Sequence, residues 1–275
     1  GRRAGGALRW IYIAGVRFQP GELVKLCLVV WLAGYLASSD TRLKEFVPGV
    51  VVPGGVLALI TGLYLSQPDF GSAVIICAIA LCMMFVAGLG LRCLGVVGLA
   101  AVGAAALLVV AAPYRMKRLM AFVNPGDDVQ GIGYQLLQSL IAVGSGELFG
   151  VGLGGSAQKL FFLPAAHTDF IVAVVGEELG FVGCLFVLSL FLLFLWRGIA
   201  LTGRVADDTY RSALVVGCML RVILPAMLNA GVVLGLLPTK GLVLPLIGYG
   251  GSSALVSLLA VGLMLAVARS TQTRS

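Results

Sequence analysis

Long apolar runs separated by short polar segments dominate the pattern of the chain. Three of these runs, at 47–65, 72–91 and 93–113, contain no Asp, Glu, Lys or Arg. A helix needs about 20 apolar residues to cross the hydrocarbon core of a bilayer. Because water-soluble folds rarely contain three such runs in succession, the pattern predicts an integral membrane protein.

The same pattern predicts an all-α polytopic bundle of about seven transmembrane helices, which we expect to form a single domain over 1–275. The spanning helices are expected near 20–37, 46–65, 72–91, 94–113, 170–196, 212–236 and 253–268. Pro48, Pro53 and the pair Gly54-Gly55 interrupt the second of them. Such breaks are tolerated in a membrane where neighbouring helices or cavities satisfy the freed backbone groups.

Other segments depart from the spanning pattern. The long polar loop 114–169 contains the stretch YQLLQSLIAV (134–143), which predicts a short amphipathic helix at the membrane interface in preference to a substrate contact. The uncharged run 241–268 is too long for one span, so we interpret its first dozen residues as a non-helical loop packed inside the protein. Asp69 is expected to cap the third helix, and the N-terminal stretch GRRAGGALRW is interpreted as a loop.

Composition supports the membrane assignment and excludes some classes of function. Hydrophobic residues make up 60% of the chain and charged residues 11%, with a mean hydropathy of +1.06; soluble chains carry roughly a quarter charged residues. The net charge of +7 comes from Lys and Arg spread through loops, which indicates a membrane protein and no nucleic-acid partner. The six cysteines form no CxxC or Cys/His cluster, so neither a disulfide framework nor a metal site is indicated.

The distribution of basic residues predicts the orientation of the chain. The loops 38–46, 91–93 and 197–211 and the tail from 269 fall on one side and hold eight Lys and Arg. On the other side the short turn 66–71 holds none and the 237–253 loop holds Lys240 alone, and long loops count little in this rule. Cytoplasmic loops carry the excess of positive charge. We therefore expect the long loop to be extracytoplasmic, although the arginines of the N-terminal flank count against this orientation.

Charged residues inside apolar segments are costly and mark candidate sites. Glu22 and Lys25 stand three residues apart at the start of the first helix and can pair on one face. Arg221 lies in the middle of the sixth helix and must find a carboxylate or a cavity. We assign these three residues a structural or supporting role, with a substrate role left open.

The densest group of titratable residues lies in LPAAHTDFIVAVVGEELG (163–180), which contains His167, Asp169, Glu177 and Glu178. On an ideal helix Asp169 and Glu177 are about 80° and about 12 Å apart, too far for a close carboxylate pair, so their roles should differ. Asp169 is either a general base at the outer end of the fifth helix or an N-cap.

Basic residues in the long loop are candidates for phosphate binding. They are Arg115, Lys117, Arg118 and Lys159. Charge-assisted hydrogen bonds from such side chains neutralise phosphate groups. The alternative is ordinary anchoring at the membrane interface.

Several strings together resemble the SEDS family (shape, elongation, division and sporulation), and its division branch, FtsW, more than its rod-elongation branch. The matching strings are RW…FQPGELVK (9–25), QPDFGSA (67–73), PYRMKRLMAFVNP (113–125), the stretch from GYQLLQ to GEELG (133–180) and LPTKGLVLPLIGYGGSS (237–253). They occur in the family's order, spaced by spanning helices. The resemblance covers essentially the whole chain.

The resemblance implies a ten-helix fold with both ends cytoplasmic, so that three N-terminal helices are absent from this chain. It implies a peptidoglycan glycosyltransferase that uses lipid II and works with a class B penicillin-binding protein and other division proteins. Its place would be the bacterial inner (cytoplasmic) membrane at the division septum, with an extracytoplasmic active side. The family's essential aspartate falls on Asp169, and its conserved lysine falls on Lys240.

The chain departs from the family pattern at a few positions. QPGE replaces the usual QPSE or QPAE at 19–22, Ala165 replaces a glutamate, and Gly248 replaces a serine. A glutamine–asparagine pair of the later helix is present as Pro225 and Asn229. A role carried over to Gly248 or Pro225 is therefore in doubt, whereas Asp169 and Lys240 are retained.

The resulting hypothesis is a glycosyl transfer in which Asp169 accepts a hydroxyl proton and Lys240 and the loop cations stabilise the departing lipid diphosphate. His167, Glu177 and Glu178 would shape the site, and a divalent cation (Mg²⁺ or Mn²⁺) would be a possible helper. Two other functions stay open. One is a flippase that moves lipid II across the membrane lipid bilayer, and the other is a non-catalytic scaffold that activates the transpeptidase.

Overall fold

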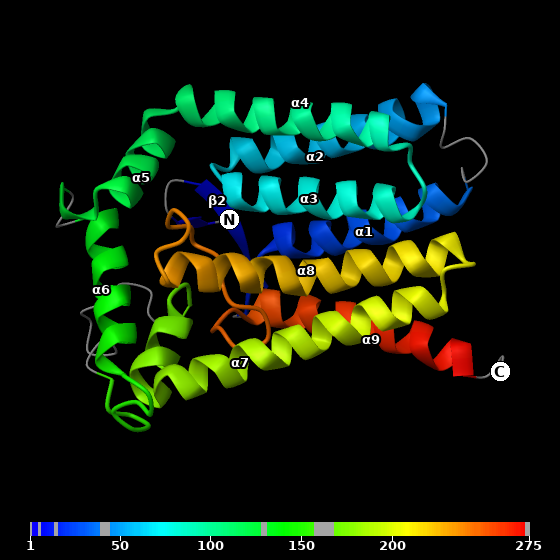
Figure 1. Cartoon of the computed structure of the whole chain (residues 1–275). Helices are drawn as coiled ribbons and strands as arrows, with labels where there is room; N and C mark the ends of the chain where they lie inside the picture. The colour runs from blue at the N-terminus through cyan, green and yellow to red at the C-terminus, as the bar shows by residue number, and fades with distance from the viewer. Residues whose placement is uncertain are drawn as a thin grey trace. The chain divides into compact units, whose positions relative to one another are not determined.

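The computed structural model describes residues 2–4, 7–13, 16–38, 45–127, 131–156 and 168–272. The chain forms two compact units (Figure 1). The first comprises Gly1–Ala105, Phe194–Ile223 and Gly251–Ser275, and the second Ala106–Leu193 and Leu224–Gly250. Three helices continue from one unit into the other; that both units form one domain stays a prediction.

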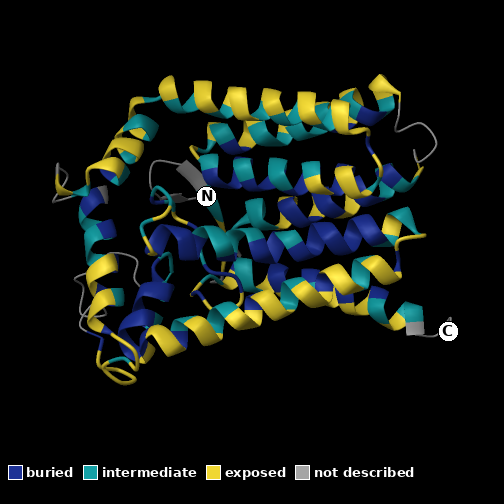
Figure 2. Cartoon of the chain, in the orientation of Figure 1, coloured by how far each residue is buried: buried dark blue, intermediate teal, exposed yellow. Residues whose placement is uncertain are grey.

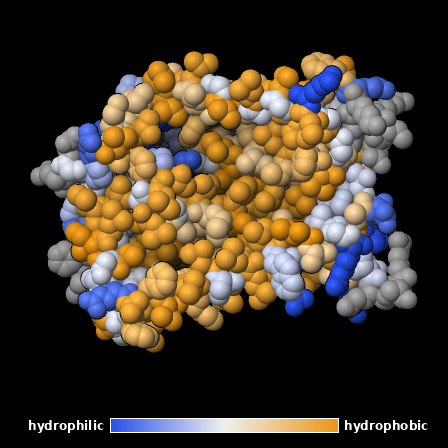
Figure 3. Space-filling view, viewed as in Figure 1, coloured by the Kyte–Doolittle hydropathy of each residue, from blue (hydrophilic) through white to orange (hydrophobic). Residues whose placement is uncertain are grey.

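Helices make up most of the described chain. They are α1 (Pro20–Ser38), α2 (Val52–Ser66), α3 (Phe70–Val86), α4 (Leu91–Val110), α5 (Pro113–Val123), α6 (Ile132–Ser145), α7 (Ile171–Arg204), α8 (Thr209–Val233) and α9 (Gly251–Gln272). In the described part, 6 helices are long and apolar enough to cross a membrane, counting the π-helical entry to α2, and α3 is a shorter apolar helix. The prediction of about seven spanning helices is confirmed. Their surface is mostly hydrophobic in the view of Figure 3.

In the first unit, α1, α2 and α3 pack around a small apolar core of Leu28, Tyr64, Ala73 and Ile76. The predicted interruption of the second helix is a π-helical turn, Val47–Val51, that leads directly into α2. Pro48 lies in the first turn of this stretch, where a missing N–H removes no bond. Its carbonyl oxygen accepts from the Tyr35 hydroxyl of α1 at 2.8 Å. Asp69 caps α3, as predicted, by accepting from the Ser72 N–H at 3.0 Å.

The N-terminal stretch is a small antiparallel sheet and not the expected loop. Strands β1 (Arg2–Ala4), β2 (Ala7–Ile13) and β3 (Val16–Phe18) pair in that order. The prediction missed them because two strands have only three residues, too few to show an alternating pattern. The Arg9 guanidinium fixes the sheet to the turn after α2, donating to the Gln67 carbonyl oxygen at 2.5 and 2.9 Å.

The second unit contains α5, α6 and the irregular segment 234–250. Helix α6 coincides with the predicted amphipathic helix, and the segment between α8 and α9 is non-helical, as predicted. Helix α5 is an addition to the prediction; it begins at Pro113, a residue suited to a first helical turn. Figure 2 shows that α8 is largely buried whereas α4 is exposed. An apolar helix with an exposed surface suits a lipid environment.

Candidate active site

Asp169 lies in the turn that leads into α7. The carbonyl oxygen of the next residue, Phe170, accepts from the N–H groups of Ala173 and Val174 at 2.9 and 3.3 Å, so Phe170 occupies the N-cap position. The Asp169 carboxyl group is hydrogen-bonded by the side chain of Thr168. It also faces Gly241, because a Cβ placed on that glycine would lie 3.1 Å from Asp169 Oδ2.

The electrostatic environment of Asp169 combines opposing effects. Burial is the largest of them and raises the pKa of the Asp169 carboxyl above its ordinary value. The hydrogen bond from Thr168 and the positive charge of Arg118 lower the pKa and offset part of that rise. The site therefore holds a carboxyl group of raised pKa, and a raised pKa suits a general base.

Asn229, near the end of α8, ties this turn to the loop that follows the helix. Its side-chain nitrogen donates to the backbone carbonyl oxygens of Asp169 at 2.7 Å and Leu242 at 2.6 Å. The side chain is only 1% exposed. One buried amide thus sets the position of Asp169 relative to Lys240, which stands two residues before Leu242.

Arg118 on α5 brings a third element to the site. Its Nη1 donates to the Thr239 carbonyl oxygen at 3.4 Å, and its guanidinium lies 4.7 Å from the centre of the Tyr114 ring. Lys240 is half-buried in the same loop, next to Thr239 and Gly241. Arg118, Lys240 and Asp169 are therefore gathered around one short stretch, 239–241, although they are far apart in sequence.

Three buried atoms around this stretch have hydrogen-bonding capacity beyond what the described residues use. They are Arg118 Nε, Asn229 Oδ1 and Thr239 Oγ1. A buried polar atom without a partner costs roughly 1–3 kcal/mol, so native proteins keep few of them, and each calls for an explanation. Two donors and an acceptor beside a carboxylate suit a polar, oxygen-rich ligand such as a sugar or a phosphate.

The remaining predicted residues of the second unit lie in different surroundings. Glu177 and Glu178 are buried on α7, and Glu177 accepts a hydrogen bond from the Ser156 hydroxyl. Arg115 is half-buried and donates to the Leu108 carbonyl oxygen at 2.7 Å, while Lys117 is exposed. His167 and Lys159 lie outside the described residues.

The first unit holds a separate charged cluster. Lys25 Nζ lies 2.8 Å from Glu22 Oε1, and Arg221 Nη2 lies 3.0 Å from Glu22 Oε2. The guanidinium also donates to Ser257 Oγ on α9 at 3.0 Å. Glu22 is thus the carboxylate that Arg221 needs, and the cluster joins α1, α8 and α9.

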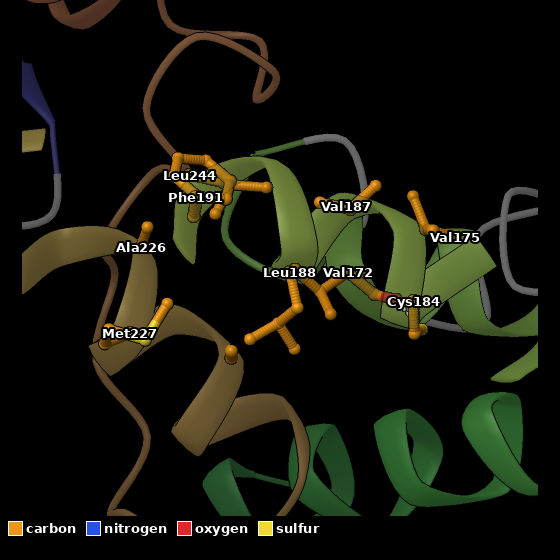
Figure 4. A pocket seen from close by; sticks show the side chains of 10 residues that line it. Val172, Val175, Cys184, Val187, Leu188, Phe191, Ala226, Met227 and Leu244 are labelled. Atoms are coloured by element: carbon orange, nitrogen blue, oxygen red, sulfur yellow. Dashed lines mark hydrogen bonds between the residues drawn. The ribbon is translucent and has the colours of Figure 1, made fainter. Parts of the chain in front are cut away.

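An apolar cavity lies between α7, α8 and the irregular segment (Figure 4). The lining residues include Val172, Val187 and Phe191 of α7, Met227 of α8 and Leu244. It measures about 20 Å³. Val172 is only three residues from Asp169, so the hydrocarbon-lined space begins close to the polar site.

Comparison with known proteins decides the family. The model of the FtsW/RodA/SpoVE cell cycle proteins matches residues 1–273. The chain belongs to this family. Curated members named "Probable peptidoglycan glycosyltransferase FtsW" include one from Alkalilimnicola ehrlichii, 46% identical over 97% of this chain and 67% of its own length. Another, from Coxiella burnetii, is 43% identical over 99% of this chain and 74% of its own length.

Solved structures agree with the family assignment. A chain from "Structural coordination of polymerization and crosslinking by a peptidoglycan synthase complex" superimposes with a TM-score of 0.77 at 31% identity, covering 98% of this chain and 76% of its own. RodA of Thermus thermophilus gives a TM-score of 0.63 at 32% identity, covering 98% of this chain and 71% of its own. The chain spans about two thirds of the length of the curated relatives.

The structure explains the glycine at 248 but not the proline at 225. A Cβ on Gly248 would lie 2.6 Å from Val243 Cγ1, so the local packing accepts only glycine without a shift. Pro225 lies inside α8 and cannot donate to the Arg221 carbonyl oxygen, yet the helix continues on either side. The contacts of the Asp169 carboxyl described above involve neither residue, whereas Asn229 of the same family pair holds the Asp169 backbone.

Proposed function

We propose that the chain carries the active site of a peptidoglycan glycosyltransferase that polymerises lipid II into glycan strands during septal wall synthesis in cell division. The observation that carries the proposal is the gathering of Asp169, Arg118 and Lys240 around residues 239–241, next to an apolar cavity. A base and two cations match a substrate that presents a sugar hydroxyl and a diphosphate.

In the proposed reaction, the 4-hydroxyl oxygen of one lipid II sugar attacks the anomeric carbon of the growing glycan. A new carbon–oxygen bond forms, the bond to the lipid diphosphate breaks, and the diphosphate leaves with the bonding electron pair. Asp169 accepts the hydroxyl proton during the attack. A positioned general base contributes about 10²–10⁴-fold to the rate of such a step.

The cations of the site would stabilise the charge that develops on the departing diphosphate. The Arg118 guanidinium offers several donors, one of which, Nε, has no partner among the described residues. Lys240 supplies a second positive charge from the adjacent loop.

Assistance by Mg²⁺ or Mn²⁺ stays a prediction. Within the described residues, no three His, Cys, Asp or Glu side chains converge into a donor set, and the site carboxylate stands beside Arg118. Such an ion would therefore be bound mainly through the substrate diphosphate, as Mg²⁺ often is. No step of the proposed reaction is routed through it.

The flippase alternative rests on the charges inside the spanning helices. Glu22, Lys25 and Arg221 are the observed cluster, but they are mutually paired and contact a hydroxyl of α9. An ion-pair network that joins three helices is better suited to bracing them than to passing a substrate. The transferase therefore remains the better supported function.

The partners and location follow the same proposal. Lipid II would be the substrate, and a class B penicillin-binding protein would crosslink the product. The words "polymerization and crosslinking" describe the similar synthase complex and support this pairing. We place the protein in the bacterial cytoplasmic membrane at the septum, with Asp169 on the extracytoplasmic side.

The test is the conversion of labelled lipid II by the purified protein, reconstituted in proteoliposomes with a class B penicillin-binding protein. The proposal expects a ladder of muramidase-sensitive glycan strands. A parallel assay measures movement of lipid II between leaflets. Leaflet transfer without polymer would support the flippase, and neither activity together with stimulated crosslinking by the partner would support the scaffold.

A further inference from the structure

Helix α7 is broken near its outer end. Gly180 has φ 65° and ψ −163°, which divides the 34-residue helix into 171–179 and 181–204. In a continuous helix the carbonyl oxygens of Glu177 and Glu178 would accept from the N–H groups four residues later. Instead, they accept from the N–H groups of Val151 and Gly152 at 2.9 and 3.1 Å.

The loop also accepts hydrogen bonds from the helix. The N–H groups of Phe181 and Val182, freed by the break, donate to the carbonyl oxygens of Glu147 and Leu148 at 2.9 and 3.2 Å. We call residues 146–155, which follow α6, the insert loop. The backbone of this loop thus forms hydrogen bonds with these two carbonyl oxygens and two N–H groups of α7. The same bonds satisfy four backbone groups of the loop.

Glycines allow the loop backbone to come this close to the helix. Gly150 has φ +80°, and a Cβ there would overlap the backbone of Glu178. Gly180 has φ +65°, and a Cβ there would lie 2.6 Å from the Leu148 carbonyl oxygen. Two backbones in contact leave no space for side chains between them, so the side chains of the loop must point outward.

The outward side chains are large and apolar. Leu148 is 60% exposed, Phe149 80%, Val151 51% and Leu153 81%, and the loop carries no charged residue after Glu147. Figure 2 shows the turn that follows α6 as mostly exposed. A soluble surface rarely presents four such residues within six positions, whereas an apolar loop with a satisfied backbone is compatible with lipid.

The depth of the insert loop in the membrane can be inferred from the residues of α7. Trp196 and Arg197, typical interface residues, mark one boundary of the span, with the guanidinium 5.1 Å from the Trp196 ring centre. Counting back from Trp196 to the break covers the helical residues 181–196, about 24 Å at 1.5 Å per residue, which is a little less than the roughly 30 Å of the hydrocarbon core. The insert loop is bonded to 177–182 and therefore lies at the opposite edge of the hydrocarbon layer, continuous with the exposed Phe181 and Val182.

We propose that the insert loop is a membrane-dipping anchor whose Leu148, Phe149, Val151 and Leu153 side chains enter the acyl chains of the leaflet on the side of the long loop. The occupant of this surface is phospholipid. By fixing the break of α7 at the membrane edge, the anchor would set the depth of the short segment 171–179 and of the turn before it, which carries Asp169. The proposal does not depend on the reaction that Asp169 performs.

The test uses a single tryptophan as a reporter of lipid contact. Trp10, Trp31 and Trp196 are replaced by Phe, and Phe149→Trp is introduced in proteoliposomes of phosphatidylcholine brominated at shallow (6,7) or deep (11,12) acyl positions. Phe186→Trp, on the exposed surface of α7, is the lipid-facing control, and Asp207→Trp, in the exposed turn before α8, is the aqueous control. Leu153→Trp is a second reporter, should Phe149→Trp reduce expression.

Insertion predicts at least twofold stronger quenching of the Phe149→Trp reporter than of the aqueous control, with the shallow bromines more effective than the deep ones. Quenching no stronger than that of Asp207→Trp at both reporters would overturn the proposal. Quenching that disappears when the class B penicillin-binding protein is added would also overturn it, because the surface would then belong to a protein partner.

Discussion

Asn229 holds Asp169 by its backbone, through a hydrogen bond of 2.7 Å from the side-chain nitrogen to the Asp169 carbonyl oxygen. The same nitrogen holds Leu242, so the turn before α7 and the loop that carries Lys240 share one buried donor. The proposed base and the proposed cation therefore depend on a residue that would touch neither proton nor phosphate. Asn229 is a positioning residue in this account.

Replacing Asn229 with Ala should lower kcat by about 10²-fold, because misplacement of a reacting group by about 1 Å has a cost of that order. The KM for lipid II should change far less, since the groups that bind diphosphate are retained. Ser139→Ala is the matched control. It removes another buried hydrogen bond to the end of α8, to the Val233 carbonyl oxygen at 3.2 Å, but at a distance from the Asp169 turn. Equal losses in both variants would show that Asn229 serves only stability.

Gly241 should tolerate no side chain. A Cβ at this position would lie 3.1 Å from Asp169 Oδ2, closer than ordinary van der Waals contact, so Gly241→Ala displaces the carboxylate or the loop by a few tenths of an ångström. We expect several-fold slower polymerisation with unchanged thermal stability. Gly144→Ala provides the comparison, since a Cβ there meets no described atom within 4 Å. A fully active Gly241→Ala variant would mean that the Asp169 carboxylate does not need its observed position.

The pH dependence of polymerisation reports the environment of Asp169. A general base must be ionised, so kcat/KM should fall as the pH drops through the raised pKa of the Asp169 carboxyl. Arg118 lowers that pKa; its removal in Arg118→Gln should therefore raise the pKa and move the acid limb of the profile to higher pH. Lys117→Gln removes an exposed charge of the same helix and should leave the limb in place. A limb that moves to lower pH in Arg118→Gln would contradict the assignment.

The cluster of Glu22, Lys25 and Arg221 should contribute to stability. Glu22→Gln leaves the Arg221 guanidinium, only 2% exposed, without its carboxylate, and breaking a buried pair in this way costs about 3–5 kcal/mol. The expected result is a clearly lower unfolding temperature in detergent. Asp208→Asn is the control, because the two side chains of its pair with Arg211 are 22% and 42% exposed, and such partly solvated pairs are worth about 0–1 kcal/mol. A Glu22→Gln protein that is as stable as wild type but inactive would instead support a substrate role for the cluster.

The sequence predicted those features that depend on local pattern. The lengths of the apolar runs predicted the spanning helices, and the periodicity of YQLLQSLIAV predicted α6. Features that depend on distant contacts were missed. The partner of Arg221 lies 199 residues away, which no pattern reveals. A lone glycine such as Gly180 is often tolerated in a helix, so the break in α7 depends on the insert loop and was not predicted.

The role of Asn229 in the candidate active site also depends on distant contacts and could not be predicted from local pattern. A single amide in an apolar helix carries no charge and no motif of its own, so only the family's glutamine–asparagine pair pointed to it. Asp169 was named from the residues as a base or a cap, and the resemblance added its essential role and that of Lys240. The structure adds how Arg118 and Asn229 lie around them. Helix α5, which supplies Arg118, was missed because its apolar residues are interrupted by Arg115, Lys117 and Arg118 within a long polar segment.

The measurement that tests the central claim most directly is the rate of glycan polymerisation from lipid II by the Asp169→Asn variant in proteoliposomes with its transpeptidase. Asp69→Asn is the matched control, because that aspartate precedes α3 as a cap and Asn caps a helix equally well. The account predicts that Asp169→Asn folds and binds its partner but makes no detectable polymer, while Asp69→Asn polymerises at the wild-type rate. Polymerisation by Asp169→Asn at a rate close to wild type would contradict the account.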